Sequence, residues 1–379
     1  MRKLRVWVYL LVFVIPTMAA ATTNQLQPLD VFNLEFVSDP QISPDGKRIV
    51  YTRNFKDVMT DQNHSNLWMV NFDGSNNRPL TTGNHRDYGA VWSNDGNKLV
   101  FLSNQADDKV KLYMMWMDNQ QQVALTNTQQ PPSNVSWSAD DKQLVFTAFV
   151  PKSKPSLINM PAKPEGAQWN EGPVYIDDMQ YRSDGRGYLK PGNTQIFTLS
   201  ADGGTPRQMT DSPHDHRSPV WSKDGQHIFF AANRHAEHEF EPLNAEIYRL
   251  SVSDLTVTAL TDRFGPDVGP QVSPDGKYLA YMGFDDTFQG HTIRELYVMD
   301  VDGNNKQLIS AALDRSVQSM AWRGDSKGLY VQYTDQGDGK LAFISRSGQV
   351  KQVADTLGGL SLGRPYNAAA FSVSENDRL

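Results

Sequence analysis

The sequence contains no cysteine among its 379 residues. A disulfide framework, a zinc site with thiolate ligands and a cysteine nucleophile are therefore excluded. No cluster of Lys and Arg follows the first five residues and the formal net charge is -7, so we expect no nucleic-acid partner. With 39% hydrophobic and 21% charged residues, the chain has the balance of a globular protein and not of a collagen, a coiled coil or a multi-span membrane protein.

Long apolar runs are also scarce, and the one that stands out lies at the N-terminus. The run from Val6 to Ile15 follows three basic residues within the first five, and the small residues Ala19 to Ala21 come shortly after it. A basic start, a short apolar run and a small-residue end predict a signal peptide over residues 1–21, cleaved after Ala21. We therefore expect a periplasmic or secreted mature chain that is not attached to the membrane. An uncleaved N-terminal anchor is the alternative.

An eleven-residue phrase recurs along most of the chain. Its first copy is Gln41-Ile-Ser-Pro-Asp-Gly-Lys-Arg-Ile-Val-Tyr51. The copies begin at Gln41, Val91, Ser136, Val220, Gln271, Ala321 and Phe371. Most are 45 to 51 residues apart, and one interval, between the third and the fourth copy, is 84 residues. Self-similarity at such a period is typical of repeat architectures.

Each copy has the chemistry of a β-hairpin turn. Pro44 fixes φ, Asp45 can bond its own backbone, and Gly46 accepts a left-handed conformation. A second pair of apolar runs around a polar turn, such as Leu67 to Leu80, lies between successive copies. Four strands per repeat predict an all-β fold, a β-propeller of four-stranded blades. A β-sandwich array is the rival, but sandwiches do not repeat one turn phrase at constant spacing.

The predicted domain limits follow from the repeat. A lead-in segment covers residues 22–39, and the propeller covers residues 40–379. Six copies are followed by a further hairpin, whereas the seventh reaches only Leu379. We therefore expect a seven-bladed propeller whose last blade is incomplete in this chain.

The long interval predicts an insertion at about residues 151–192. Its first half is rich in proline and polar residues, as an extended excursion would be. Its second half carries Tyr175-Ile-Asp-Asp-Met-Gln-Tyr-Arg182 and Asp184-Gly-Arg-Gly-Tyr188. Long loops on a rigid scaffold often form binding surfaces, and a solvated excursion packed on the rim is the equally open alternative.

Four segments carry a resemblance to a known family. They are Leu29 to Gly46, Tyr181-Arg-Ser-Asp-Gly-Arg-Gly-Tyr-Leu189, Ala232 to Tyr248 and Ser361 to Pro365. In order and spacing they resemble the N-terminal propeller of the prolyl oligopeptidase family of serine peptidases, in its bacterial dipeptidyl and acylaminoacyl peptidase branch. The resemblance implies a propeller that screens and helps bind short peptides. It also implies a partner, a C-terminal α/β-hydrolase domain with a Ser-Asp-His triad, that is missing from this sequence or separate.

The sequence has one match to the nucleophile-elbow pattern of that hydrolase fold, Gly359-Leu-Ser361-Leu-Gly363. A working elbow needs a buried strand before the Ser and a helix after it. The residues before this Ser are weakly apolar, and Pro365 would interrupt the first helical turn. The Asp and His that follow the Ser in the fold's chain order have no room here. We therefore predict no catalytic residue in this chain.

The histidines raise the question of a metal. His214 and His216 are two residues apart, and His235 and His238 lie in a turn-like stretch. Neither pair has the spacing that places two ligands on one helical face, and no cysteine can complete a site. We expect these side chains to pack within or between blades, and we expect no metal and no cofactor.

Three carboxylates alternate in the loop of the fourth repeat, at Glu237, Glu239 and Glu241. A free peptide N-terminus is a cation, and the family resemblance implies that propeller carboxylates capture it in relatives that remove dipeptides. These three residues are therefore the candidate substrate-binding residues, although the paired-Glu motif of the best-known branch is not reproduced. Asp177 and Asp178 are weaker candidates. A solvated acidic loop is the alternative interpretation.

Two functions remain open. The first is the propeller domain of an exported serine peptidase that binds short peptides for the missing hydrolase domain. The second is a stand-alone periplasmic propeller that acts as a protein-binding module, similar to that of the Tol-Pal system. No constellation for an enzyme that acts through the propeller alone is visible in the sequence.

Overall fold

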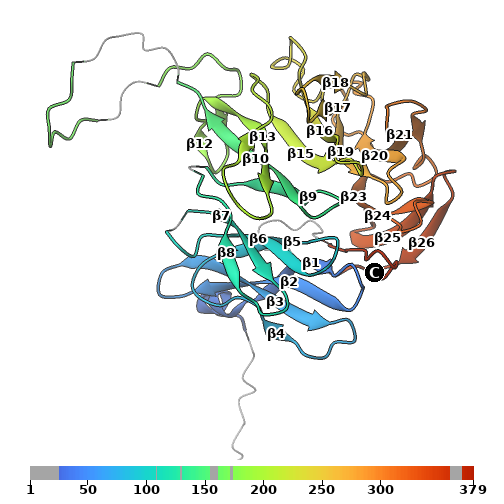
Figure 1. The fold of residues 1–379 in the computed structure, drawn as a ribbon, viewed down its shortest axis with the longest axis horizontal. Helices are drawn as coiled ribbons and strands as arrows, with labels where there is room; N and C mark the ends of the chain where they lie inside the picture. The colour runs from blue at the N-terminus through green and yellow to red at the C-terminus, as the bar shows by residue number, and fades with distance from the viewer. Residues whose placement is uncertain (1–24, 108, 129, 154–160, 171–173, 359–368) are drawn as a thin grey trace, which may run out of the picture.

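The computed structural model describes residues 25–379, with the exception of 108, 129, 154–160, 171–173 and 359–368. The predicted signal peptide and Ser361 lie outside the described residues. Within the described residues, six antiparallel sheets of four strands follow one another around a ring (Figure 1). The predicted all-β propeller with four-stranded blades is therefore confirmed, and the structure shows six such blades.

The first three sheets cover the N-terminal half, after a short 3₁₀ helix, η1 (Pro28–Asn33). The first sheet holds β1 (Phe36–Ile42), β2 (Arg48–Asp57), β3 (Gln62–Asn71) and β4 (Arg78–Pro79). The second holds β5 (Asp87–Trp92), β6 (Lys98–Ser103), β7 (Lys111–Trp116) and β8 (Gln122–Ala124). The third holds β9 (Ser133–Trp137), β10 (Gln143–Pro151), β13 (Gly192–Ser200) and β14 (Arg207–Gln208). Between β10 and β13 the insertion forms a separate two-stranded hairpin, β11 (Arg182–Ser183) and β12 (Gly187–Tyr188).

The last three sheets are regular repeats in sequential order. The fourth holds β15 (His216–Trp221), β16 (His227–Ala232), β17 (Glu246–Ser251) and β18 (Val257–Ala259). The fifth holds β19 (Asp267–Val272), β20 (Tyr278–Gly283), β21 (Glu295–Asp300) and β22 (Gln307–Leu308). The sixth holds β23 (Val317–Trp322), β24 (Gly328–Asp335), β25 (Asp338–Ser345) and β26 (Val350–Ala354). No helix in the described ranges is long and apolar enough to cross a membrane.

The repeated phrase forms the turn between the first two strands of each sheet, as the sequence predicts. In the first copy the Arg48 N–H donates to Ser43 Oγ at 3.0 Å, and the Ser43 hydroxyl donates to Asp45 Oδ1 at 2.6 Å. Gly46 adopts φ +70°, which glycine takes without strain. The phrase thus closes each hairpin with its own side chains.

Each pair of successive sheets encloses one apolar core, five in all within the described residues. Between the first and second sheets, for example, Val50 and Leu67 pack against Leu99 and Phe101, and all four are fully buried. The tryptophan of the phrase adds a polar link, because Trp92 Nε1 donates to the Gln41 carbonyl of the preceding sheet at 3.0 Å. The alternating apolar residues of the inner strands explain this packing, since opposite faces of one sheet serve two neighbouring cores.

The seventh copy of the phrase lies between the sixth and the first sheet. The described residues 369–379, which contain this copy, form a turn and no strand. The Gly324 N–H of the sixth sheet donates to Asp377 Oδ1 at 2.7 Å, and the Ile42 N–H of the first sheet donates to Ser372 Oγ at 3.0 Å. No apolar core joins the sixth and first sheets directly among the described residues. The structure therefore shows six blades plus this segment, and the predicted seventh blade stays a prediction.

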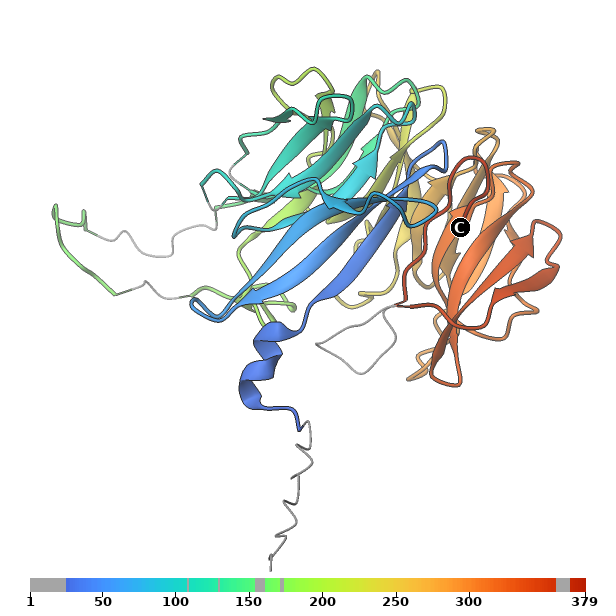
Figure 2. The same cartoon turned by 90° about the horizontal axis from the view of Figure 1, so that it is seen from below.

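Long segments gather at one end of the propeller. Because neighbouring strands are antiparallel, the loops between second and third strands and the connections from one sheet to the next share this end. It carries the insertion, the loop at residues 233–245 between β16 and β17, and the entry from η1; Figure 2 shows η1 and the insertion projecting away from the blades. We call this end the loop face, and the turns of the repeated phrase lie at the opposite end.

Candidate functional site

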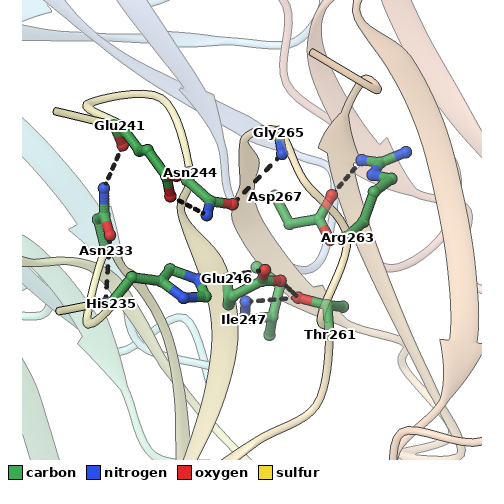
Figure 3. A network of polar contacts seen from close by, with 10 residues as sticks. All are labelled: Asn233, His235, Glu241, Asn244, Glu246, Ile247, Thr261, Arg263, Gly265 and Asp267. Atoms are coloured by element: carbon green, nitrogen blue, oxygen red, sulfur yellow. Dashed lines mark hydrogen bonds and ion pairs between the residues drawn. The ribbon is translucent and has the colours of Figure 1, made fainter. Parts of the chain in front are cut away.

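The loop between β16 and β17, residues 233–245, is held in place by its own amide side chains (Figure 3). Asn233 Nδ2 donates to the Glu241 carbonyl at 2.7 Å, and Asn244 Nδ2 donates to Glu241 Oε2 at 3.0 Å. The Gly265 N–H donates to Asn244 Oδ1 at 3.4 Å, which ties the loop to the connection that leads into the fifth sheet. Asn244 is buried. The loop is therefore a fixed platform on the loop face.

The three glutamates that the sequence singles out do not converge. Glu241 is half-buried, and its carboxylate accepts the hydrogen bond from Asn244. Glu239 is exposed, and its Oε2 accepts the Met179 N–H at 3.1 Å from the insertion. Glu237 is exposed, and its carbonyl accepts hydrogen bonds from within the loop. Only Glu239 faces the insertion.

A hollow of about 600 Å³ lies where the insertion meets this loop. It is lined by Met179, Gln180, Tyr181, Arg182, Asp184, Glu239 and Pro242. The first five come from the insertion hairpin on the third sheet, and the last two come from the loop on the fourth sheet. The hollow lies between elements of two different sheets and is open to solvent, with apolar and charged groups side by side, so a small molecule bound there would stay partly exposed.

Apolar side chains around the hollow are open to solvent. Met179 is 58% exposed and Tyr181 is 44% exposed, and Phe240 on the adjoining loop is 71% exposed. Such a concentration of exposed large apolar groups on one face is typical of an interaction site. Asp177 and Asp178 are exposed on the same insertion but do not line the hollow.

Beneath the loop lies a buried polar network that joins the fourth and fifth sheets (Figure 3). The Thr261 hydroxyl donates to Glu246 Oε2, and the other carboxylate oxygen, Oε1, lies 3.5 Å from His235 Nε2. Arg263 forms an ion pair with Asp267 at the start of β19. Glu246 and Asp267 are each 1% exposed. The network therefore places two carboxyl groups in the interior, directly under the candidate loop.

Burial decides how these two carboxyl groups titrate. Loss of water raises the pKa of Glu246 from 4.5 to about 7, and the neighbouring carboxylate of Asp267 adds to this rise. Burial also raises the pKa of Asp267 from 3.8 to about 6, although the Arg263 guanidinium opposes the rise. Both groups can therefore change charge close to neutral pH.

Three of the four histidines around this loop pack against other rings, and the fourth, His235, faces Glu246. His216 is buried; its Nδ1 donates to the Thr194 carbonyl at 3.1 Å, and its Nε2 lies 3.1 Å from Arg234 Nη1. Because the guanidinium can only donate, this imidazole is neutral with its proton on Nδ1, and burial lowers its pKa to about 4. His214 meets His238 edge-on with ring centroids 4.8 Å apart. Across the described ranges, no three His, Asp or Glu side chains are grouped to hold a metal ion.

Sequence reasoning missed Glu246 and its partner hydroxyl as a site. The Ile247 N–H donates to Thr261 Oγ1, fourteen residues later, at 2.9 Å. A hydrogen bond between a backbone N–H and a hydroxyl fourteen residues later recurs in other sheets. The matching pairs are Leu67–Thr81, Leu112–Thr126, Ile196–Thr210 and Leu296–Ser310. In the third sheet Gln195 stands where Glu246 stands, and it accepts the Thr210 hydroxyl at 2.8 Å. An acid at the start of a buried apolar strand, fifteen residues before a repeated hydroxyl, is the signal that could have found Glu246.

Comparisons with known proteins agree with this fold. Residues 187–361 match the family described as TolB beta propeller domain. The chain is 26% identical over 366 residues to the uncharacterized peptidase YuxL of Bacillus subtilis, covering 92% of this chain and 55% of that protein. It is 26% identical over 350 residues to dipeptidyl-peptidase 5 of Porphyromonas gingivalis, covering 89% of this chain and 50% of that protein. The chain is related to these peptidases.

A solved structure supports the same relationship at the level of the fold. The acylaminoacyl peptidase of Pyrococcus horikoshii superimposes with a TM-score of 0.65 at 14% identity, over 86% of this chain and 47% of that one. Taken together, the alignments with the two peptidases and this shared fold confirm the resemblance to the propeller of the prolyl oligopeptidase family. The chain spans about half the length of the curated relatives it matches.

Proposed function

We propose that this chain is the peptide-binding propeller of an exported serine peptidase. The observation that carries the proposal is the alignment with peptidases over 92% and 89% of this chain, but over only 55% and 50% of theirs. We infer that the matched half of those relatives is their propeller region, because this chain folds as a propeller. The remainder of such a peptidase supplies the α/β-hydrolase domain and its triad, and this chain supplies no catalytic residue.

Short peptides would bind at the loop face, in the hollow beside Glu239. One carboxylate oxygen of Glu239 accepts the Met179 N–H, and the other has no partner in the part of the chain that the structure describes. That oxygen can accept a hydrogen bond from the ammonium group of a free peptide N-terminus. Met179, Tyr181 and Pro242 offer apolar surface for the adjoining side chain. Glu237 and Glu241 would contribute negative potential and loop rigidity, respectively.

Calorimetric titration of the 379-residue chain with Ala-Phe-amide tests this proposal. The peptide with a free amino group should bind, and its N-acetylated form should bind at least several-fold more weakly because the ammonium is lost. Glu239→Gln should weaken binding of the free form about three- to tenfold, the effect of one exposed charge-assisted contact. Asp202→Asn, an exposed carboxylate in the turn after β13 at the opposite end of the third sheet, should leave binding unchanged. Equal binding of the free and acetylated peptides would contradict a role for Glu239.

Export through the predicted signal peptide is part of the same proposal. The mature protein recovered from an exporting host should begin after Ala21, because the basic start, apolar run and Ala-rich end form one processing signal. Intact-mass measurement decides this. A chain that still begins near Met1 would remove the cleavage proposal and leave the propeller unaffected.

A seven-bladed ring is the finer architecture that we propose. The first copy of the phrase has a glycine, Gly46, three residues after Ser43. In the third, sixth and seventh copies, a residue with a polar side chain stands at this position. That side chain accepts a backbone N–H from the preceding copy. The three contacts are Asn94 N–H to Asp141, Asp275 N–H to Ser326, and Gly324 N–H to Asp377. The seventh copy thus contacts the sixth blade in the same way as the turns of the third and sixth blades contact the blades before them.

The match to the TolB beta propeller domain favours a second candidate, a protein-binding module of the cell envelope. Such a module would bind a folded protein partner at the loop face and would show no measurable binding of short peptides. Crosslinking in the exporting host, followed by mass spectrometry, separates the two candidates. A single stoichiometric protein partner together with absent peptide binding would favour the module.

A further inference from the structure

The hollow on the loop face contains a cation as well as carboxylates. Arg182, at the start of β11, lines it together with Asp184 and Glu239. The Arg182 side chain is exposed and has no hydrogen-bond or ion-pair partner among the residues that the structure describes. An unpaired guanidinium presents a planar fork of donors that matches a carboxylate. Arg182 is therefore available for an anionic group of a ligand.

The opposite charges come from different elements. Arg182 belongs to the insertion hairpin, and Glu239 belongs to the loop between β16 and β17, where the Met179 N–H bond joins the two elements at 3.1 Å. The volume of about 600 Å³ is that of a site for a small molecule. A dipeptide is about 7 Å long when extended, at about 3.3–3.6 Å per residue. Such a molecule carries one charge of each sign at its two ends.

We propose that this hollow binds a dipeptide as a zwitterion. Arg182 receives the free carboxylate, Glu239 receives the free ammonium, and Met179, Tyr181 and Pro242 pack against the side chains. This inference rests on the proposed peptide-binding function and deepens it, because it gives the ligand two free ends and hence a short length. A ligand of this kind is also what a reaction that releases dipeptides would produce.

The charge pattern argues against simpler ligands. A phosphate or another multiply charged anion would face the carboxylates of Asp184 and Glu239 across the same hollow. A purely cationic ligand would face the guanidinium of Arg182. A neutral apolar ligand would leave all three charges without a partner when it displaced their water. A zwitterion satisfies both signs at once.

The test is a calorimetric comparison of Ala-Phe with a free carboxylate and Ala-Phe-amide, each with a free amino group, on the 379-residue chain. We expect the free acid to bind about tenfold more tightly than the amide, as one charge-assisted contact would give. Arg182→Gln should remove that difference by weakening the acid alone, and Arg182→Lys should restore part of it. Arg186→Gln is the matched control, because Arg186 lies on the same hairpin and does not line the hollow.

The outcomes separate this inference from the proposed function. Equal binding of acid and amide, or equal losses for both in Arg182→Gln, would overturn the zwitterion site and leave peptide binding at Glu239 standing. Loss of the acid preference in Arg186→Gln would also overturn the assignment to Arg182. If neither peptide binds, the proposed function and this inference both fail. Circular dichroism of each variant confirms that the fold is intact.

Discussion

At the scale of single residues, Glu246 is a carboxylic acid buried in the interior. It is 1% exposed, its pKa is raised by burial to about 7, and its Oε1 has no hydrogen-bond partner within the described residues. Between pH 4.5 and 7 the folded protein binds a proton here that the unfolded chain releases. The contribution of Glu246 to stability is therefore present at low pH and is lost as the pH rises through this window.

Glu246→Gln should accordingly stabilise the protein above neutral pH. The amide carries no charge to bury, and Gln195 shows that glutamine fits the equivalent position and accepts the hydroxyl of Thr210. We expect a gain of about 3 kcal/mol in the free energy of unfolding at pH 8, because folding raises the pKa of the Glu246 carboxyl from 4.5 to about 7. The gain should fall below about 1 kcal/mol at pH 5. Urea unfolding at both pH values measures it, with Asp202→Asn as the exposed control; a gain that is the same at pH 5 and pH 8 would contradict the account.

The sequence predicted the acidic loop but could not predict which acid faces the hollow. Glu237, Glu239 and Glu241 are equivalent as an alternating pattern. Their contacts differ for two reasons. Asn244 donates a hydrogen bond to the carboxylate of Glu241, and the insertion, sixty residues away in the chain, places the Met179 N–H against Glu239. Contacts at such a separation carry no local sequence signal. The burial of Glu246 could not be predicted from the sequence for the same reason, because it depends on contacts with the neighbouring sheet.

At the scale of elements, the loop at residues 233–245 is held by two amide side chains, of which Asn244 is buried. Asn244 holds the carboxylate of Glu241 and accepts the Gly265 N–H. Asn244→Ala should destabilise the protein by about 1–3 kcal/mol, because buried partners lose their hydrogen bonds. It should also speed amide hydrogen exchange within the loop and weaken peptide binding. Asn119→Ala, in the exposed turn between β7 and β8, is the control, and unchanged exchange in the loop would refute the role of Asn244.

The tryptophans of the phrase offer a matched pair of element-scale tests. Trp322 Nε1 donates to the Gln271 carbonyl of the fifth sheet at 2.9 Å, whereas Trp221 Nε1 is buried without a partner in the described part of the chain. Both side chains are 8% exposed. Trp322→Phe should therefore cost about 1 kcal/mol more than Trp221→Phe, the worth of one buried hydrogen bond. Thermal melting of the two variants measures the difference; equal costs would mean that packing alone joins the sheets.

Most strands could be predicted because the residues of the repeated phrase form the turn through local contacts. Ser43, Asp45 and Gly46 close the turn with local bonds, and the continuous apolar run of strands such as β6 follows from burial on both faces. The site of the insertion followed from the one long interval. What lay beyond prediction was the two-stranded hairpin within it, β11 and β12, and its approach to the fourth sheet, since both depend on tertiary contacts.

At the scale of the whole molecule, the seam between the sixth and first sheets differs from the other five junctions. Five junctions are apolar cores, whereas this one is occupied by residues 369–379 in the described part of the chain. Asp377 accepts the Gly324 N–H at 2.7 Å, and Asn376 Nδ2 donates to the Asp45 carbonyl at 3.1 Å. The segment therefore links the two ends of the ring through polar contacts.

Asp377→Gly tests whether this link supports the ring. Asp377 has φ +63°, which glycine adopts freely, so the change removes the acceptor without adding strain. We expect a loss of about 1 kcal/mol, seen as a fall of about 1–2 °C in Tm, and faster exchange of the Gly324 amide. Asp202→Gly, in an exposed turn of the third sheet, controls for the added backbone freedom. An unchanged Tm would show that the seam is held without this contact.

Peptide binding at the loop face is the central claim, and hydrogen exchange on the 379-residue chain measures its location directly. The chain is incubated with and without saturating Ala-Phe-amide, and exchange is followed by mass spectrometry along the sequence. We predict protection of residues 177–188 and 233–245, which surround the hollow, and no change in the turns of the repeated phrase at the opposite end. Protection confined to those turns, or no protection at saturation, would contradict the account.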